Sequence, residues 1–92
     1  MYSLRPSKGY KKALKRLSRS GSFDIQELEK VLIILAAGEV LPQRYDNHRL
    51  QGEYAGCFEC HIKNDLLLIY EIDELEKVLT VVDIGSHSDL FS

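Results

Sequence analysis

The spacing of the apolar residues changes once along the chain, and this change restricts the fold more than any other feature. Up to Gly38 the apolar residues recur every three or four positions, which is typical of amphipathic helices. From Tyr54 onwards they alternate with polar residues or form short apolar runs, which is typical of strands. Helices followed by a series of strands indicate an α+β fold, with a helical hairpin on one face of a mainly antiparallel sheet.

The first helix is expected to begin after Pro6, with Ser7 as its N-cap, and to end at Gly21. Seven basic residues and no acidic residue occur within positions 1–19, whereas the rest of the chain holds five basic residues and all fourteen acids. This helix is therefore expected to bind a polyanion or an acidic protein, with a solvated helix face as the alternative. Its apolar face comprises Tyr10, Leu14 and Leu17.

The second helix has clearer boundary signals. Asp24 can act as the N-cap with Glu27 three residues later, and Phe23 and Leu28 are spaced as a hydrophobic staple. Gly38 is expected to follow its last turn. Only residues 21–23 separate the two helical patterns, so an antiparallel hairpin is predicted. The expected buried stripe comprises Ile25, Leu28, Val31, Leu32 and Leu35.

The strands complete a (β)ααβββ order, expected to form one domain over residues 1–92. Residues 2–5 are predicted as a short first strand, and residues 39–53 as a long irregular loop. Three further strands are predicted at 54–62, 66–72 and 78–84, with turns between them and a short polar tail after residue 85. A chain this short has room only for a shallow site, better suited to a polymer than to an enclosed small molecule.

Three histidines and one aspartate are expected to meet at one end of this sheet. His61 closes one predicted strand, Asp65 follows the turn, and His87 lies three residues after the last strand. Because neighbouring strands run antiparallel, these three positions share an edge, and the long loop can bring His48 to them. Such a set could transfer protons to and from RNA, whose 2′-hydroxyl is a built-in nucleophile.

Two other interpretations of these residues remain open. Three histidines and an aspartate are zinc donors, although no two histidines have chelating spacing; or each histidine is a surface or capping residue. The Cys57 and Cys60 pair lies in a predicted strand, where positions i and i+3 face opposite sides, so two reduced thiols are expected. No signal peptide or membrane span is apparent, which indicates a cytoplasmic protein.

Residues 41–91 carry three ordered motifs that resemble the YafQ-type branch of the RelE toxin superfamily. The first runs from Leu41-Pro42 through Tyr45, His48 and Leu50 to Gly52; the second is Glu59-Cys60-His61-Ile62 with Asp65 and Leu67-Leu68-Ile69-Tyr70; the third is Gly85 to Phe91. The resemblance implies a RelE-like fold and an mRNA interferase, the toxin half of a bacterial type II toxin–antitoxin pair.

The resemblance also implies a mechanism and partners. Such toxins cut mRNA in the ribosomal A site, where the 2′-hydroxyl attacks the adjacent phosphate, and they use no metal or other cofactor. By position, His48, His61, Asp65 and His87 form the acid–base set, with His87 expected as general acid. A small acidic antitoxin would cover the groove and make the only contact with DNA. Phe91 would place the mRNA, and the basic first helix would face ribosomal RNA through Lys8, Lys11, Lys12, Lys15 and Arg16.

The chain departs from the family pattern where relatives often have arginine or an aromatic residue. Asp83 and Phe58 stand at two arginine positions, and Leu66 stands at the aromatic one. A cation near the scissile phosphate stabilises the developing charge, and losing one such donor costs roughly 10²–10³ in rate. Either another cation takes this role, such as Arg49 or a lysine of the first helix, or the protein is a weak nuclease that acts mainly as a binding module.

Overall fold

The computed structural model describes residues 1–21 and 23–91, and its elements follow the expected order with four short additions. The additions are two 3₁₀ helices, a two-residue strand and a C-terminal helix. The elements are β1 Ser3–Pro6, α1 Lys8–Ser18, α2 Ile25–Ala36, η1 Gln43–Tyr45, β2 His48–Arg49, η2 Gly52–Tyr54, β3 Phe58–Lys63, β4 Leu66–Asp73, β5 Val78–Gly85 and α3 His87–Phe91.

Both long helices begin at the predicted caps. The Oγ of Ser7 accepts a hydrogen bond from the backbone N–H of Tyr10 at 3.0 Å, and Oδ1 of Asp24 accepts one from the N–H of Glu27 at 3.2 Å. Gly38 follows α2 with a φ of 78°, a conformation that suits glycine and ends the helix.

The prediction of the buried stripe of α2 was wrong for one residue, Ile25. Ile25 is 44% exposed, whereas Leu28, Val31 and Leu35 are buried. Ile25 is the first residue of α2, and Phe23, just before the cap, packs against the core in its place. The buried stripe therefore begins one turn later than the periodicity indicated.

The sheet has the strand order β1-β5-β4-β3-β2, which confirms a mainly antiparallel α+β fold. Among the strands that the structure describes, only β1 and β5 run parallel, with Ser3 opposite Val78. The predicted first strand is therefore present and lies at one edge of the sheet. At the other edge, β2 pairs with β3 and carries His48, which had been expected in an irregular loop.

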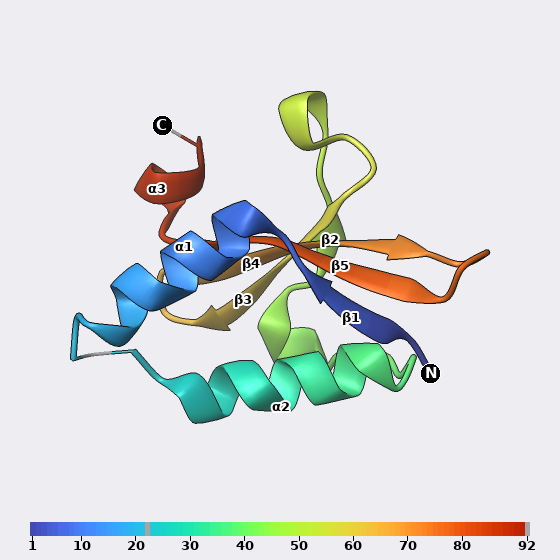
Figure 1. Ribbon diagram of the computed structural model, residues 1–92, viewed down its shortest axis with the longest axis horizontal. Coiled ribbons are helices and arrows are strands. Elements are labelled where there is room, and N and C mark those ends of the chain that lie inside the picture. The colour runs from blue at the N-terminus through green and yellow to red at the C-terminus, as the bar shows by residue number, and fades with distance from the viewer. Residues whose placement is uncertain (22, 92) are drawn as a thin grey trace.

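Different elements pack against the two faces of the sheet. The two long helices run in opposite directions over one face, where their buried side chains pack against Cys60, Leu68 and Tyr70 (Figure 1). The helical hairpin on one face is thus confirmed. The other face has a smaller cluster of Cys57, Leu67, Ile69 and Leu90, and α3 and the η2 turn stand beside it. The two cysteines are free and lie in clusters on opposite faces, as predicted.

The segment before β3 and the tail after β5 differ from the expectation. The strand begins at Phe58 rather than Tyr54, because Gly56 has a φ of 92° and the N–H of Cys57 donates to the carbonyl of Tyr54 in a tight turn. The tail forms α3 because Ser86 and Asp89 hydrogen-bond reciprocally at its start. No helix within residues 1–21 and 23–91 is long and apolar enough to cross a membrane.

Candidate functional site

Four aromatic rings form a continuous row on the sheet face that α1 and α2 leave uncovered. The ring centroids are 6.3 Å apart from His48 to His61, 6.1 Å from His61 to His87, and 5.8 Å from His87 to Phe91. A fifth ring, that of Tyr54, contacts Phe91 edge-on with centroids 5.8 Å apart. The structure therefore brings together all three histidines, which come from β2, β3 and the start of α3.

Strand register explains this row. His48 on β2 lies opposite Glu59 on β3, Glu59 lies opposite Ile69 on β4, and Ile69 lies opposite Asp83 on β5. Residues directly opposite each other share a face, so these four side chains cross the sheet in one line. His61 lies two residues after Glu59 and falls on the same face.

Glu59 is the buried partner of two of the histidines. Its side chain is 4% exposed, and its Oε1 lies 3.2 Å from Nε2 of His48 and 3.6 Å from Nε2 of His61. A buried carboxylate needs such partners, because an unpaired charge away from water is strongly unfavourable. Oδ2 of Asp46, an exposed carboxylate, lies 3.6 Å from Nε2 of His61.

The contacts of His48 also fix where its protons lie. Its Nδ1 is 2.8 Å from the carbonyl oxygen of Asp46, and a carbonyl only accepts, so Nδ1 carries a proton. Nε2 then faces the Glu59 carboxylate, 3.2 Å from its Oε1. Asp46 adopts a left-handed conformation with a φ of 46°, which Asp tolerates better than most residues.

Asp65 and His87 form a second acid–histidine pair across the sheet edge. Oδ1 of Asp65 lies 3.3 Å from Nδ1 of His87 and accepts the His87 backbone N–H at 3.2 Å. Both side chains are well exposed, at 65% and 60%. Asp89 caps the same helix, and its hydrogen bond from the Ser86 N–H lowers the pKa of that carboxyl. The predicted convergence of His61, Asp65 and His87 at one end of the sheet is observed.

Arg49 does not join the row. It lies opposite Phe58, and its guanidinium carbon is 5.2 Å from the centre of the Phe58 ring. Phe58 stacks on Tyr70 within the core on the helix-covered side. Arg49 is therefore on the face opposite His48, because adjacent residues of a strand face opposite sides.

Asp83 brings a further carboxylate to the face that carries the histidines. It ends the line that begins at His48, and it is half-buried with its Oδ1 accepting the N–H of Ile84 at 2.8 Å. Burial raises the pKa of the Tyr54 hydroxyl, and the negative charge of Asp83 raises it further. Asp83 also borders an open depression of about 240 Å³ whose wall includes Lys12 and Arg16 of α1.

The basic side chains of α1 lie on the surface of the protein. All five basic side chains expected to face RNA are exposed, and they lie on the helix that packs beside β5. They are Lys8, Lys11, Lys12, Lys15 and Arg16.

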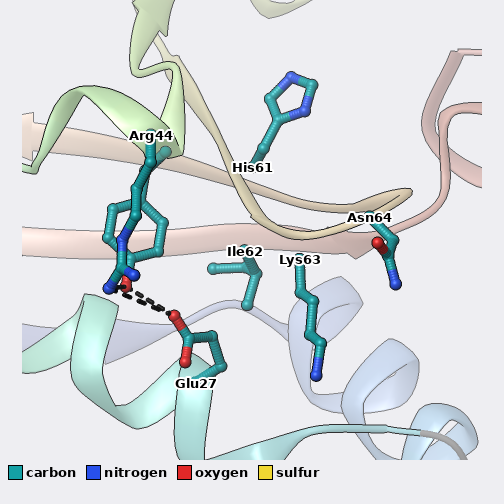
Figure 2. A pocket seen from close by; sticks show the side chains of 7 residues that line it. Glu27, Arg44, His61, Ile62, Lys63 and Asn64 are labelled. Atoms are coloured by element: carbon teal, nitrogen blue, oxygen red, sulfur yellow. Dashed lines mark hydrogen bonds and ion pairs between the residues drawn. The ribbon is translucent and has the colours of Figure 1, made fainter.

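A hollow that His61 borders lies mainly on the other side of β3, beside Glu27 of α2. Ile62 and Lys63 border it too, but Figure 2 shows the His61 side chain pointing to the opposite side of β3 from these two residues. The hollow, of about 460 Å³, is bordered by Glu27, which accepts a hydrogen bond from the Tyr45 hydroxyl at 2.6 Å. That bond lowers the pKa of Glu27, so this wall is a structural network rather than part of the histidine row.

Sequence reasoning missed three members of the site, namely Asp46, Tyr54 and Glu59. The signal for Glu59 was present, because a residue two before His61 in a strand shares its face. Among residues 1–21 and 23–91, no three histidine, cysteine, aspartate or glutamate side chains are placed to hold a metal ion.

The chain is similar in sequence to a known family of proteins. The family model described as "Bacterial toxin of type II toxin-antitoxin system, YafQ" matches residues 2–92. The mRNA interferase toxin YafQ of Escherichia coli K12 is 33% identical over 91 residues, covering 98% of this chain and 91% of that protein.

Solved structures agree over the whole chain. A metal-bound toxin from Helicobacter pylori is 42% identical and superposes with a TM-score of 0.91, covering 99% of this chain and 100% of that one. The toxin in the E. coli DinJ–YafQ complex is 27% identical with a TM-score of 0.87, covering 100% of both chains.

Proposed function

The chain belongs to the YafQ family of bacterial type II toxins, and from this premise we propose that it is a ribosome-dependent mRNA endoribonuclease. The observation that carries the proposal is the row of three histidines, each within 3.6 Å of a carboxylate. Two acid–histidine pairs on one open face supply the two proton transfers that cleavage through a 2′-hydroxyl needs.

In this reaction the 2′-oxygen forms a bond to phosphorus, and the bond from phosphorus to the 5′-oxygen breaks. One group takes the proton of the 2′-hydroxyl, and another gives a proton to the leaving 5′-oxygen. The products are a 2′,3′-cyclic phosphate and a new 5′-hydroxyl end. The protein's own side chains supply both transfers, and no metal or other cofactor is required.

We assign the proton donor to His87 with Asp65, and the proton acceptor to the His48–Glu59 pair, in which Nε2 of His48 is freed for the 2′-hydroxyl when its contact with Glu59 opens. Glu59 is buried and lies 3.2 Å from His48, so it can hold the charge of a protonated ring. Asp65 contacts Nδ1 of His87 and leaves Nε2 of that ring open to substrate. His61 lies between the two pairs, where a cationic ring would face the charge developing on the phosphate.

The remaining groups place the substrate. Phe91 stands at the end of the row and offers a ring face to a base, with Tyr54 supporting it edge-on. The exposed cations of α1 would bind ribosomal RNA phosphates, which give affinity without sequence information. The location of the protein would then be the bacterial cytoplasm, where ribosomes are.

A cognate antitoxin is the proposed protein partner, since a YafQ relative was solved in complex with DinJ. An acidic antitoxin would suit the exposed cations of α1, and covering the histidine row would block substrate. Contact with DNA would be made by the antitoxin alone.

A second function is favoured by Asp83. A carboxylate in the line of His48 and Glu59 repels a phosphate there, so the protein could bind antitoxin and ribosome with little cleavage. Phe58, at the other position where the family resemblance implies an arginine in many members, supplies no cation either. The two functions differ in cleavage rate and not in partners.

The deciding experiment is primer extension on a translated mRNA after brief expression in a bacterial host. Wild type is expected to produce cuts within codons being translated, and His87→Ala is expected to abolish them. Ser88→Ala, an exposed change at the next position of α3, is the matched control and should cut like wild type. If wild type neither cuts mRNA nor slows growth, the nuclease proposal fails and the binding function is favoured.

A further inference from the structure

The backbone that carries His48 is weakly held on the sheet. His48 belongs to a strand of only two residues at the sheet edge, and its side chain is 44% exposed. The backbone of β2 pairs with β3 at two positions, and the next backbone link is from the N–H of Leu50 to the carbonyl of Cys57 at 2.9 Å. Contacts beyond this backbone pairing are needed to hold Nε2 of His48 at 3.2 Å from Oε1 of Glu59.

The residue before His48 is tied to the core. The buried hydroxyl of Tyr70 donates a hydrogen bond of 2.6 Å to Oδ1 of Asn47. Tyr70 lies on β4 and is 1% exposed, so its ring does not move independently of the sheet. Burial raises the pKa of this hydroxyl, so it remains a donor at neutral pH.

The residue after His48 is tied to the same ring system. The guanidinium of Arg49 lies over Phe58 at 5.2 Å, and Phe58 stacks on Tyr70 with centroids 5.5 Å apart and planes 18° apart. An arginine over an aromatic face is attracted to it, and the stacked pair adds its own packing.

We infer that the Phe58–Tyr70 pair positions His48 by holding both of its sequence neighbours on the opposite face of the sheet. With residues 47 and 49 fixed on the helix-covered side, the alternation of a strand directs residue 48 to the other side, toward Glu59. Phe58 and Tyr70 are thus positioning residues that act through the backbone and do not touch substrate. The inference rests on the proposed function only in taking His48 to be an acid–base group.

The experiment follows His48 directly by NMR of the imidazole ring resonances, alongside cleavage kinetics. Tyr70→Phe removes only the hydroxyl, and Asn47→Ala removes the same hydrogen bond by changing its exposed partner. Phe58→Leu removes the stacked ring, whereas Phe58→Tyr keeps an aromatic ring at this position. Phe23→Leu, at another partly buried position on the same core, is the matched control.

In Tyr70→Phe, Asn47→Ala and Phe58→Leu, the His48 resonances are expected to shift and broaden while those of His87 stay in place. The turnover rate should fall about ten-fold with KM unchanged within about two-fold, since misplacing a group by about 1 Å can cost up to 10²-fold. Phe58→Tyr and Phe23→Leu should match wild type in both measurements.

Unchanged His48 resonances in the first three variants would overturn the inference. The NMR result stands whether or not the wild type cleaves RNA. An inactive wild type with displaced His48 resonances in the variants would therefore refute the nuclease and leave the positioning intact.

Discussion

Replacing Glu59 by glutamine tests whether the buried carboxylate organises the histidine row. The change keeps the shape of the side chain and removes its charge. Two contacts weaken, at 3.2 Å to His48 and at 3.6 Å to His61. A hydrogen bond to a charged group contributes roughly 1.5–3 kcal/mol to stability, but burying the carboxylate costs free energy that the amide avoids.

The two effects on stability therefore largely offset each other. The expected change in the free energy of unfolding is within about 1 kcal/mol, or a change in Tm of at most about 8 °C for a domain of this size. The effect on rate is expected to be much larger. Without the carboxylate, a protonated His48 loses its charge partner, and an acid–base group of this kind contributes roughly 10²–10⁴ to the rate.

The assay is single-turnover cleavage of mRNA on programmed ribosomes, with thermal melts followed by circular dichroism. The double variant Glu59→Gln with His48→Gln should be no slower than the slower single variant, because groups that act as a unit are not additive. A Glu59→Gln protein that is folded and cleaves at the wild-type rate would refute this role for Glu59. Additive losses in the double variant would show that Glu59 acts independently of His48.

Four further changes have defined outcomes. Asp65→Asn should lower the single-turnover rate by roughly 10²-fold or more without weakening ribosome binding in a pelleting assay, since its paired histidine loses a charge partner. Asp83→Arg should raise the cleavage rate roughly 10²-fold, and an unchanged rate would show that position 83 does not reach the phosphate. Lys11→Ala with Lys15→Ala should weaken ribosome binding and reduce its salt dependence by about one slope unit per lysine, with no change in Tm beyond a few degrees. Burial raises the pKa of the Cys60 thiol from 9.0 to about 12, so the folded state keeps a proton that the unfolded state loses. Stability should therefore fall as pH rises from about 9 toward 12, by at most about 1.4 kcal/mol per pH unit, and Cys60→Ala should flatten that dependence in pH-dependent melts.

Much of the fold was predictable from sequence because its signals are local. The caps at Ser7 and Asp24 are hydrogen bonds that span three residues, so the helix starts could be placed. Ile25 was predicted to be buried but is exposed, because helical periodicity does not show which turn of a helix extends beyond the sheet. β2 was missed because two residues carry no periodicity, and such a strand exists only through its pairing with β3.

The site was predictable as far as the topology determined it. His61 and His87 meet because antiparallel strands share an edge, which follows from the order of elements alone. The burial of Glu59 depends on His48 lying opposite it, eleven residues earlier, and His48 lies in a segment whose sequence shows no helical or strand pattern. The direction of Arg49 depends on the same strand, so it could not be placed until β2 was known.

The parallel pairing of β1 with β5 has a consequence for how the protein is made. Ser3 lies opposite Val78, so β1 is synthesised first but cannot pair with β5 until 75 more residues have been added to the chain. Contacts between distant segments form late in folding because a long loop must close first. The helix that carries His87 follows β5 directly, so the histidine row is assembled only after β5 and the start of α3 have been synthesised. During most of its own translation the nascent chain would lack an assembled histidine row, and the edge of β1 would be open to an early-binding partner.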